Sequence, residues 1–342
     1  MTKHEIIIGN SRNLKGIKDK SVHLIVTSPP YPMISMWDNI FGSQDSSILV
    51  DLEKGDGLNA FFKMNRLLNE IWKECDRVLV DGGFVCINIG DATRTINDKF
   101  QLYSNHTQII NYFLEMGYSV LPDIHWRKTT NAPNKFMGSG MYPAGAYVTY
   151  EHEYILVFRK GDKRVFRGEE KKIRQKSAYF WEERNLWFSD LWDIKGTSQI
   201  INKDGINRDR NASFPFEVPY RLIQMYSIEG DTILDPFGGI GTTSLACIVS
   251  NRNSFSVDID ETIAKLSLDN IYIPINAANR IIENRIERHN SFIESLPEEK
   301  KNNCYDNNQM NIKVKTRQEI DIKFNKLKSI LKDGTTIICE YE

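Results

Sequence analysis

The sequence predicts an α/β protein with a doubly wound, mostly parallel β-sheet. Short apolar runs are predicted to be strands, and apolar side chains recur at helical spacing between them. A glycine-rich turn follows one of the strands and opens a helix, which is typical of folds that bind ligands at the carboxyl ends of their strands. The predicted strands are 5–9, 22–27, 84–89, 153–158, 232–235 and 254–258, with a short final strand at 335–339.

The helices between these strands follow from the spacing of their apolar residues. Three amphipathic stretches, 61–79, 109–114 and 218–226, repeat apolar side chains every three or four positions. A fourth, 316–331, carries Ile320 and Phe324 on the same predicted face. We therefore expect helices in all four segments.

The composition indicates an ordinary soluble protein. The chain has 342 residues and a formal net charge of −1, so affinity for a polyanion would have to come from local clusters of charge. Its five cysteines show no paired spacing, so neither a disulfide framework nor a zinc site is expected, and we predict no metal. The N-terminal residues lack a signal-peptide pattern and no segment is apolar enough to span a membrane, which predicts a cytoplasmic protein.

The run Ser28-Pro29-Pro30-Tyr31 directly follows the predicted strand 22–27. Two prolines end a strand because neither supplies an N–H to the ladder and both fix φ. The result is a stiff corner that presents a hydroxyl, backbone carbonyls and an aromatic ring. These are the groups needed to hold a planar base that carries an amino group.

A second motif, residues 235–243, follows the predicted strand 232–235. Its sequence, Asp235-Pro236-Phe237-Gly238-Gly239-Ile240-Gly241-Thr242-Thr243, lets the backbone approach a ligand closely before a helix begins. The next predicted strand ends in Asp258, and an acid at that place typically binds a pair of ribose hydroxyls. This half of the chain predicts a ligand that contains a nucleoside.

In this order the two motifs resemble the beta class of DNA amino-methyltransferases, in which the Ser/Asp-Pro-Pro-Tyr motif precedes the glycine-rich motif. The resemblance extends over residues 4–275. It implies a circularly permuted, Rossmann-like methyltransferase fold with an inserted target-recognition region, and S-adenosylmethionine (AdoMet) as the cofactor. Asn10 stands where that family usually has Asp. The implied cofactor-binding residues are Asn10, Phe214, Pro215, Asp235, Pro236, Phe237, Gly238, Gly239, Gly241, Thr242, Thr243 and Asp258.

The same resemblance makes Ser28, Pro29, Pro30 and Tyr31 the implied catalytic residues. The Ser28 hydroxyl and the Pro29 carbonyl accept hydrogen bonds from the amino group of a flipped base, and Tyr31 stacks on the base. Methyl transfer is then direct and in line. The competing reaction at carbon 5 of cytosine needs a thiolate from a Pro-Cys element, and no cysteine here follows a proline.

The target base is predicted from the type of residue at position 28. Cytosine and adenine both present an amino group beside a ring acceptor, so hydrogen-bond physics does not choose between them. In the resembled family, Ser at this position mostly accompanies methylation at N4 of cytosine, and Asp or Asn mostly accompanies methylation at N6 of adenine. We therefore expect cytosine-N4 methylation of double-stranded DNA, with adenine-N6 as the alternative. A restriction–modification role is implied, with a cognate endonuclease that is not stably bound.

The predicted organisation has four parts: a catalytic half (1–158), a target-recognition region (159–212), an AdoMet-binding half (213–290) and a C-terminal extension (291–342) whose role is open. Residues 159–176 carry nine Lys or Arg against three acids, which indicates either DNA contact or a solvated charged face. The predicted DNA-contacting residues are Arg159, Lys160, Lys163, Arg164, Arg167, Lys171, Lys172 and Arg174. The irregular segment 32–59 either closes over a bound base or is a surface insertion.

Three rival functions remain open from the sequence. A nicotinamide oxidoreductase shares the glycine-rich turn and the acid after the next strand, but it leaves Ser28–Tyr31 without a purpose. A non-catalytic nucleic-acid-binding subunit would keep the fold and lose the chemistry. RNA is the third possibility, because the amino-methylation chemistry is the same.

Overall fold

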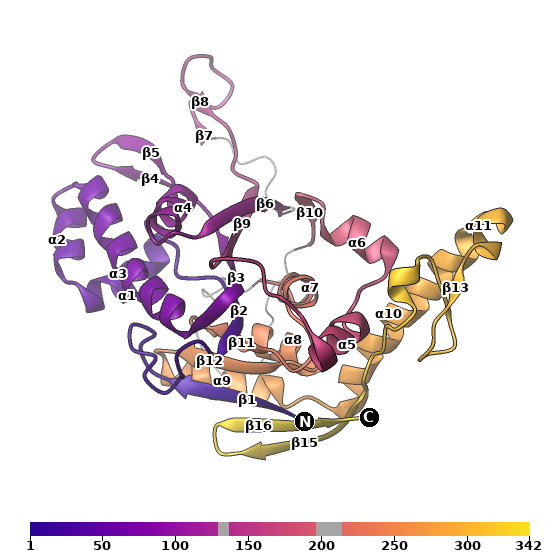
Figure 1. Cartoon of the computed structure of the whole chain (residues 1–342). Helices are drawn as coiled ribbons and strands as arrows, with labels where there is room; N and C mark the ends of the chain where they lie inside the picture. The colour runs from indigo at the N-terminus through magenta and orange to yellow at the C-terminus, as the bar shows by residue number, and fades with distance from the viewer. Residues whose placement is uncertain (129–136, 196–213) are drawn as a thin grey trace.

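The computed structural model describes residues 1–128, 137–195 and 214–342. Its centre is a ten-stranded sheet with the order β10-β6-β9-β3-β2-β11-β12-β1-β16-β15 (Figure 1). These strands are β1 (Thr2–Ile8), β2 (Val22–Thr27), β3 (Leu79–Ile89), β6 (Ser119–Arg127), β9 (His152–Arg159), β10 (Leu191–Asp193), β11 (Thr232–Asp235), β12 (Asn253–Asp258), β15 (Leu327–Asp333) and β16 (Thr336–Tyr341).

The predicted fold class is confirmed by the pairing of these strands. The five central strands β3, β2, β11, β12 and β1 are all parallel, and β9 runs antiparallel between β3 and β6. All six strands expected between residues 5 and 258 are present, and β2 and β11 have the predicted bounds. Each of the four predicted parts of the chain contributes at least one strand to this sheet.

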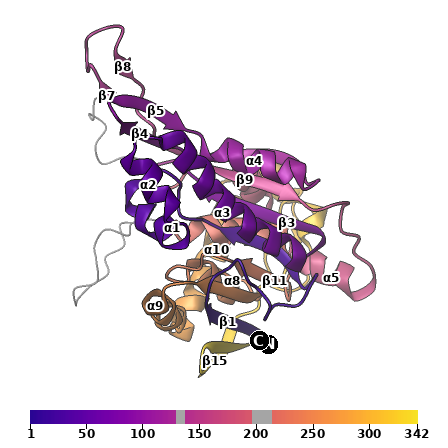
Figure 2. The same cartoon turned by 90° about the vertical axis from the view of Figure 1, so that its left-hand side faces the viewer.

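Helices cover both faces of the sheet (Figure 2). On one side lie α3 (Gly57–Val78) and α4 (Asn105–Glu115), and on the other α7 (Glu217–Tyr226), α8 (Thr242–Val249), α9 (Glu261–Ile271) and α10 (Ile275–Ser295). Side chains along β2 alternate between the two faces of the sheet. Ile25 packs into the core on the side of α3 and α4, whereas Leu24 and Val26 pack into the core on the side of α7 to α10. The shorter helices are α1 (Asp38–Gln44), α2 (Ser47–Glu53), α5 (Gly168–Lys176), α6 (Trp181–Trp187) and α11 (Glu298–Asn302).

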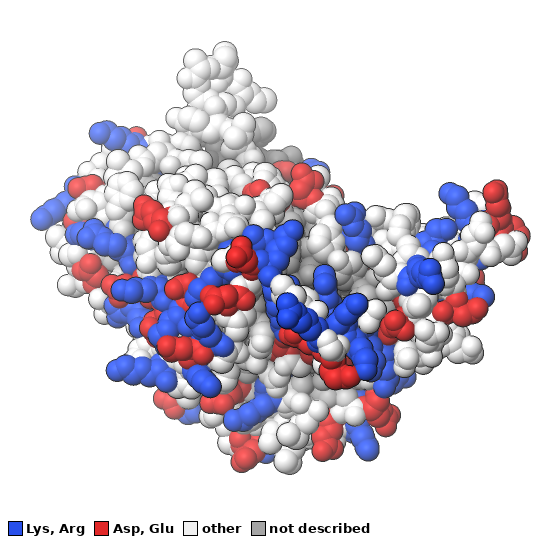
Figure 3. All heavy atoms as spheres, in the orientation of Figure 1, with Lys and Arg blue, Asp and Glu red and all other residues white. Residues whose placement is uncertain are grey.

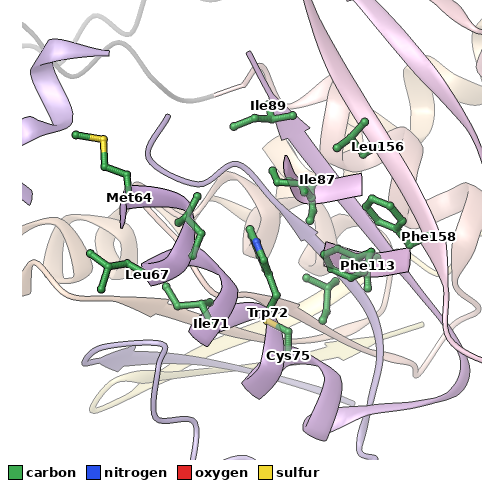
Figure 4. Packing of buried hydrophobic residues seen from close by; sticks show 14 of the residues in the cluster. Met64, Leu67, Ile71, Trp72, Cys75, Ile87, Ile89, Phe113, Leu156 and Phe158 are labelled. Atoms are coloured by element: carbon green, nitrogen blue, oxygen red, sulfur yellow. The ribbon is translucent and has the colours of Figure 1, made fainter. Parts of the chain in front are cut away.

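The core under α3 supports the ligand-binding edge of the sheet. Figure 4 shows Trp72 projecting from α3 toward Ile87 and Phe113. Trp72 is fully buried, and its ring meets that of Phe237 edge-on with 5.8 Å between centroids. Because Phe237 belongs to the glycine-rich turn, the large aromatic core directly supports that turn.

The helix predicted over 316–331 is wrong. A short 3₁₀ turn, η2 (Arg317–Glu319), and the strand β15 occupy this segment. β15 pairs antiparallel with β16, and β16 pairs antiparallel with β1. The helical spacing of the apolar residues was overridden by this pairing, which leaves Leu331 61% exposed while Leu327 is buried. The C-terminal extension therefore extends the sheet beyond β1.

Smaller elements complete the described chain. They are η1 (Ser35–Trp37) and the hairpins β4–β5 (Ala92–Ile96, Lys99–Tyr103), β7–β8 (Met137–Gly138, Ala146–Tyr147) and β13–β14 (Tyr305–Asp306, Lys313–Val314). In Figure 1 the β7–β8 hairpin projects away from the sheet above β6. None of the described helices combines the length and the apolar character needed to cross a bilayer.

Candidate cofactor and target-base site

A cavity of about 490 Å³ lies where β1, β2, β11 and β12 end, which we call the C-terminal edge of the sheet. Loops that follow all four strands contribute to its wall, as expected for an open α/β sheet. Both sequence motifs meet here, because Ser28 and Pro30 line the same cavity as the glycine-rich turn. The lining residues are Gly9, Asn10, Ser11, Ser28, Pro30, Trp37, Ile40, Ser43, Gln44, Ile71, Phe214, Asp235, Pro236, Phe237, Gly238, Gly239, Ile240, Thr242, Thr243, Val257, Asp258, Ile259, Asp260 and Ile263.

Asp235 joins the two motifs. Its carboxylate accepts hydrogen bonds of 2.6 Å from Thr27 Oγ1 and from Thr243 Oγ1, and one of 3.1 Å from the Phe237 N–H. Burial raises the pKa of Asp235 to about 6, although these hydrogen bonds oppose the shift. Asp235 thus lines the cavity as predicted, and its carboxylate also holds the turn and the end of β2 together.

The glycine-rich turn is closely packed at its first glycine. A Cβ on Gly238 would lie 1.8 Å from Ser256 Oγ and 3.1 Å from Ser256 Cβ, so a larger residue fits only if the Ser256 side chain moves. Gly239 has a φ of +51°, a left-handed conformation that glycine adopts without steric cost. Together these two residues bring the backbone of the turn against the cavity.

Asp258 and the turn hold each other in place. Asp258 Oδ2 accepts a 2.9 Å hydrogen bond from the Gly239 N–H, and Oδ1 accepts one of 2.9 Å from the Asp260 N–H. Asp260 caps α9 by accepting from the N–H groups of Thr262 and Ile263. The carboxylate predicted for ribose is therefore positioned by backbone donors at the cavity wall.

The segment 32–59 forms part of the cavity wall. Trp37, Ile40, Ser43 and Gln44, from η1 and α1, line the cavity. Gln44 Oε1 also accepts a 3.3 Å hydrogen bond from Asn10 Nδ2. Part of the segment therefore belongs to the cavity wall, and its closure over a bound base stays a prediction.

A polar cluster lies beside the cavity, around the corner formed by Ser28–Tyr31, which we call the catalytic corner after its predicted role. Ser28 Oγ is 3.1 Å from Tyr31 Oη, which donates a 2.8 Å hydrogen bond to Glu153 Oε2. Asn88 Nδ2 is 2.9 Å from Tyr31 Oη and 2.7 Å from Glu153 Oε2. The other oxygen of Glu153 is paired with Lys128 Nζ. Tyr31 fits here because Gly90 has no side chain, since a Cβ would lie 2.9 Å from the ring.

Most predicted site residues come together, but four do not line the cavity. Pro29 is buried, and Tyr31 points into the polar cluster described above. Pro215 and Gly241 also lie outside the lining, although their neighbours Phe214 and Thr242 belong to it. Sequence reasoning missed Asn88, Lys128 and Glu153. The parallel pairing of β3 with β2 places Asn88 beside the corner, whereas Glu153 reaches it because β9 runs antiparallel to β3, and Lys128 because β6 runs antiparallel to β9.

The eight predicted DNA-contacting cations lie away from the C-terminal edge. Arg159 is paired in the sheet with Phe84, which lies five positions before Ile89, the last residue of β3. Arg159 is therefore roughly 16 Å from the C-terminal edge, measured along the strands. In Figure 1, α1 accordingly lies at the left of the central strands and α5 to their right. The geometry therefore does not favour contact between these side chains and DNA beside the target base.

Several of the same cations are already paired within the chain. Arg164 binds Asp231 and Glu170, Lys172 binds Glu169, and Lys160 Nζ binds Asp76. Figure 3 shows the blue Lys and Arg groups over α5 interleaved with red acidic groups. Residues 196–212 of the predicted target-recognition region lie outside the described residues.

The charge of the cavity favours a ligand with positive character. Among the described residues that line it, three are Asp and none is Lys or Arg. A sulfonium ligand fits this distribution, whereas the pyrophosphate of a nicotinamide dinucleotide would meet carboxylates. In the part of the chain that the structure describes, no group of His, Cys, Asp or Glu is arranged to hold a metal ion.

A protein-family model described as DNA methylase matches residues 22–269. The chain is 50% identical over 327 residues to the type II methyltransferase M.MthZI of Methanothermobacter thermautotrophicus, covering 94% of this chain and 90% of that protein. It is also 48% identical over 283 residues to M.MjaI of Methanocaldococcus jannaschii, covering 80% of this chain and 92% of that protein.

Solved structures agree with the fold. TTHA0409, a putative DNA modification methylase from Thermus thermophilus solved with AdoMet, matches with a TM-score of 0.60 and 28% identity, over 78% of this chain and 93% of that one. The cytosine-N4-specific PvuII methyltransferase matches in fold, with a TM-score of 0.57 at 18% identity over 82% of this chain and 90% of that one. The predicted family and cofactor are thereby confirmed: the chain belongs to the N6/N4 DNA methylase family and is an AdoMet-dependent DNA methyltransferase of the beta class.

Proposed function

We propose that the chain methylates the exocyclic N4 of cytosine in duplex DNA. The observation that carries the proposal is Ser28, whose side chain lines the AdoMet cavity at the end of β2. In the beta class, Ser at this position accompanies cytosine-N4 transfer. Adenine-N6 is the alternative, because a hydroxyl accepts an N–H from either base equally well.

The residues of the cavity fit AdoMet. Asp258 would accept hydrogen bonds from the ribose hydroxyls, and the Gly238–Gly239 backbone would lie against the methionine part. The bound cofactor supplies a methyl group activated by a sulfonium sulfur. The carboxylates of the cavity and the absence of lysine and arginine among its described lining residues favour such a cation.

The catalytic corner would receive the base. The Ser28 hydroxyl and the Pro29 carbonyl are acceptors for the amino hydrogens, and their fixed positions direct the nitrogen lone pair toward the cavity. Ser28 and Pro30 line the wall of a cavity that a base inside a duplex cannot enter, so the target nucleotide must leave the helix. Stacking of Tyr31 on the base remains a prediction; the hydrogen bonds of the phenol involve only its oxygen and leave the ring face for stacking.

The names of the relatives support a proposal for the biological role. Proteins that are about half identical to this chain are named type II methyltransferases. We infer that this chain modifies a specific DNA sequence and thereby protects it from a cognate restriction endonuclease. Nothing in this role requires the two enzymes to be stably bound to each other.

The test is transfer of labelled methyl groups from AdoMet to unmethylated, mixed-sequence duplex DNA, followed by separation of the nucleosides. We expect label in N4-methylcytosine and none with the Ser28→Ala, Tyr31→Ala double variant. Label in N6-methyladenine would instead support the alternative. Tight DNA binding without any AdoMet binding would favour a non-catalytic subunit.

A further inference from the structure

Glu153 lies at the C-terminal edge of the sheet but outside the AdoMet cavity. It is the second residue of β9, and its side chain is only 12% exposed. One carboxylate oxygen accepts from Tyr31 Oη and Asn88 Nδ2, and the other is paired with Lys128, the residue that follows β6. A nearly buried carboxylate with this many donors stabilises one arrangement of its neighbours.

The directions of these hydrogen bonds can be assigned. An ionised carboxylate only accepts, so the single phenolic hydrogen of Tyr31 points to Glu153. Burial and the Glu153 charge raise the pKa of Tyr31 well above its ordinary value, so the phenol keeps that hydrogen. The amide of Asn88 is fixed by the same reasoning, because its nitrogen must face the carboxylate. Its oxygen Oδ1 is then buried without a partner among the described residues.

The direction at Ser28 follows from that at Tyr31. Since the phenolic hydrogen is used by Glu153, the 3.1 Å contact requires the Ser28 hydroxyl to donate to Tyr31 Oη. The single hydrogen of Ser28 is thereby directed away from the cavity that its side chain lines. The lone pairs of Ser28 Oγ are then its accepting groups; Asn88 Nδ2 lies 3.4 Å from the oxygen and donates to one of them, which leaves the other for an amino hydrogen of the base.

This direction matters for amino methylation. The amino nitrogen must keep its lone pair for the methyl group, and a hydroxyl that donated to it would occupy that lone pair. A hydroxyl that accepts instead binds an amino hydrogen and leaves the lone pair available. We propose that Glu153 is a positioning residue that, through Tyr31, holds the Ser28 hydroxyl in its accepting direction; this rests on the proposed role of Ser28 toward the amino group of the base.

The first test compares Glu153→Gln with Glu151→Gln in the full-length protein. Glu151 precedes the same strand, its side chain is 37% exposed, and it faces Arg127 at 3.9 Å. A carboxamide at 153 also offers hydrogens, so the phenol is free to turn toward Ser28 and reverse the chain of hydrogen bonds. We expect the single-turnover methyl-transfer rate of Glu153→Gln to fall roughly 10- to 100-fold relative to Glu151→Gln. The Kd for AdoMet and the Tm should match those of the control.

The second test uses Tyr31→Phe, which keeps the ring and removes the hydroxyl. We expect a comparable loss of rate, and we expect the Glu153→Gln, Tyr31→Phe double variant to be no slower than the slower single variant. An undiminished rate in either single variant overturns the proposal. So does a loss of rate that is matched by loss of AdoMet affinity and of Tm, because that indicates a merely structural role.

The identity of the methylated base is measured independently of the ratio of rates. If the wild-type product is N6-methyladenine, the cytosine proposal fails, while the ratio of rates between Glu153→Gln and Glu151→Gln still tests Glu153. If the product is N4-methylcytosine and that ratio is near one, only the inference about Glu153 fails.

Discussion

Thr27 Oγ1 donates a 2.6 Å hydrogen bond to Asp235 Oδ1 across 208 positions of sequence. The bond joins the last residue of β2, which carries the catalytic corner, to the last residue of β11, which carries the glycine-rich turn. Thr243 Oγ1 binds the other carboxylate oxygen at 2.6 Å. One buried carboxylate therefore joins the end of the strand that precedes Ser28 to the glycine-rich turn that lines the cavity.

The first prediction concerns the pH dependence of stability. Burial raises the pKa of Asp235 to about 6, so the folded chain holds this proton more tightly than the unfolded chain. Its contribution is present below the unfolded pKa of 3.8 and is lost as the pH rises through 6. The Asp235→Asn variant has no group at this position that can ionise. When the pH rises from about 4 to about 7, the free energy of unfolding of the wild type should therefore fall by ~3 kcal/mol more than that of the variant.

Urea unfolding at the two pH values measures this difference. Asp269→Asn, with a 72% exposed side chain, is the control. The two variants are compared with each other because His4 changes the stability of all of them in the opposite direction. Burial lowers the pKa of His4 to about 3, so the contribution of His4 to stability is lost as the pH falls. Equal slopes for Asp235→Asn and the control would contradict the prediction.

The second prediction concerns Asp258. Removal of its carboxylate deletes the acceptor for the Gly239 N–H and the proposed acceptor for ribose. We expect Asp258→Ala to weaken AdoMet binding roughly tenfold or more, since hydrogen bonds to charged groups contribute about 1.5–3 kcal/mol. Isothermal titration calorimetry measures the affinity, with Glu261→Gln, exposed on the neighbouring helix α9, as the matched control. Equal affinity of the two variants would show that Asp258 does not contact the cofactor.

The third prediction separates the two glycines of the turn. A Cβ on Gly238 meets Ser256 Oγ at 1.8 Å, whereas the nearest atom to a Cβ on Gly239 is 3.9 Å away. Gly238→Ala should cost about 1–3 kcal/mol through overpacking, and Ser256→Ala should recover part of that cost. Gly239→Ala should cost about 1–2 kcal/mol through backbone strain, which Ser256→Ala leaves unchanged. Urea unfolding of the single and double variants checks this, and equal recovery in both pairs would refute the packing argument.

The sequence was most informative where chemistry depends on local order. Ser28–Tyr31 and residues 235–243 are contiguous runs that end predicted strands, so their meeting at one edge of a parallel sheet could be expected before the structure was known. Ten of the twelve predicted cofactor residues line the cavity, and the exceptions are Pro215 and Gly241.

Features that depend on pairing between distant segments were not predictable. Glu153 reaches Tyr31 only because β9 runs antiparallel to β3, and no local pattern states that direction. Because β9 runs antiparallel to β3, Arg159 lies at the end of the strands opposite the C-terminal edge. The basic cluster that begins at Arg159 is therefore close to Glu153 in sequence but distant from the cavity in space. The spacing of Ile320 and Phe324 predicted a helix through residue 331, but the residues from Leu327 onward pair with β16 as β15, and Ile320 and Phe324 pack against the small cluster of Phe180, Val314 and Ile322.

The most direct measurement is nucleoside mass spectrometry of genomic DNA from a host without its own DNA methylation that expresses this chain. Such a genome presents every short target sequence, so the unknown recognition site does not limit the result. The account predicts N4-methylcytosine in the wild-type strain and none in a strain that carries Ser28→Ala. N6-methyladenine in place of N4-methylcytosine would contradict the assignment of the target base from Ser28.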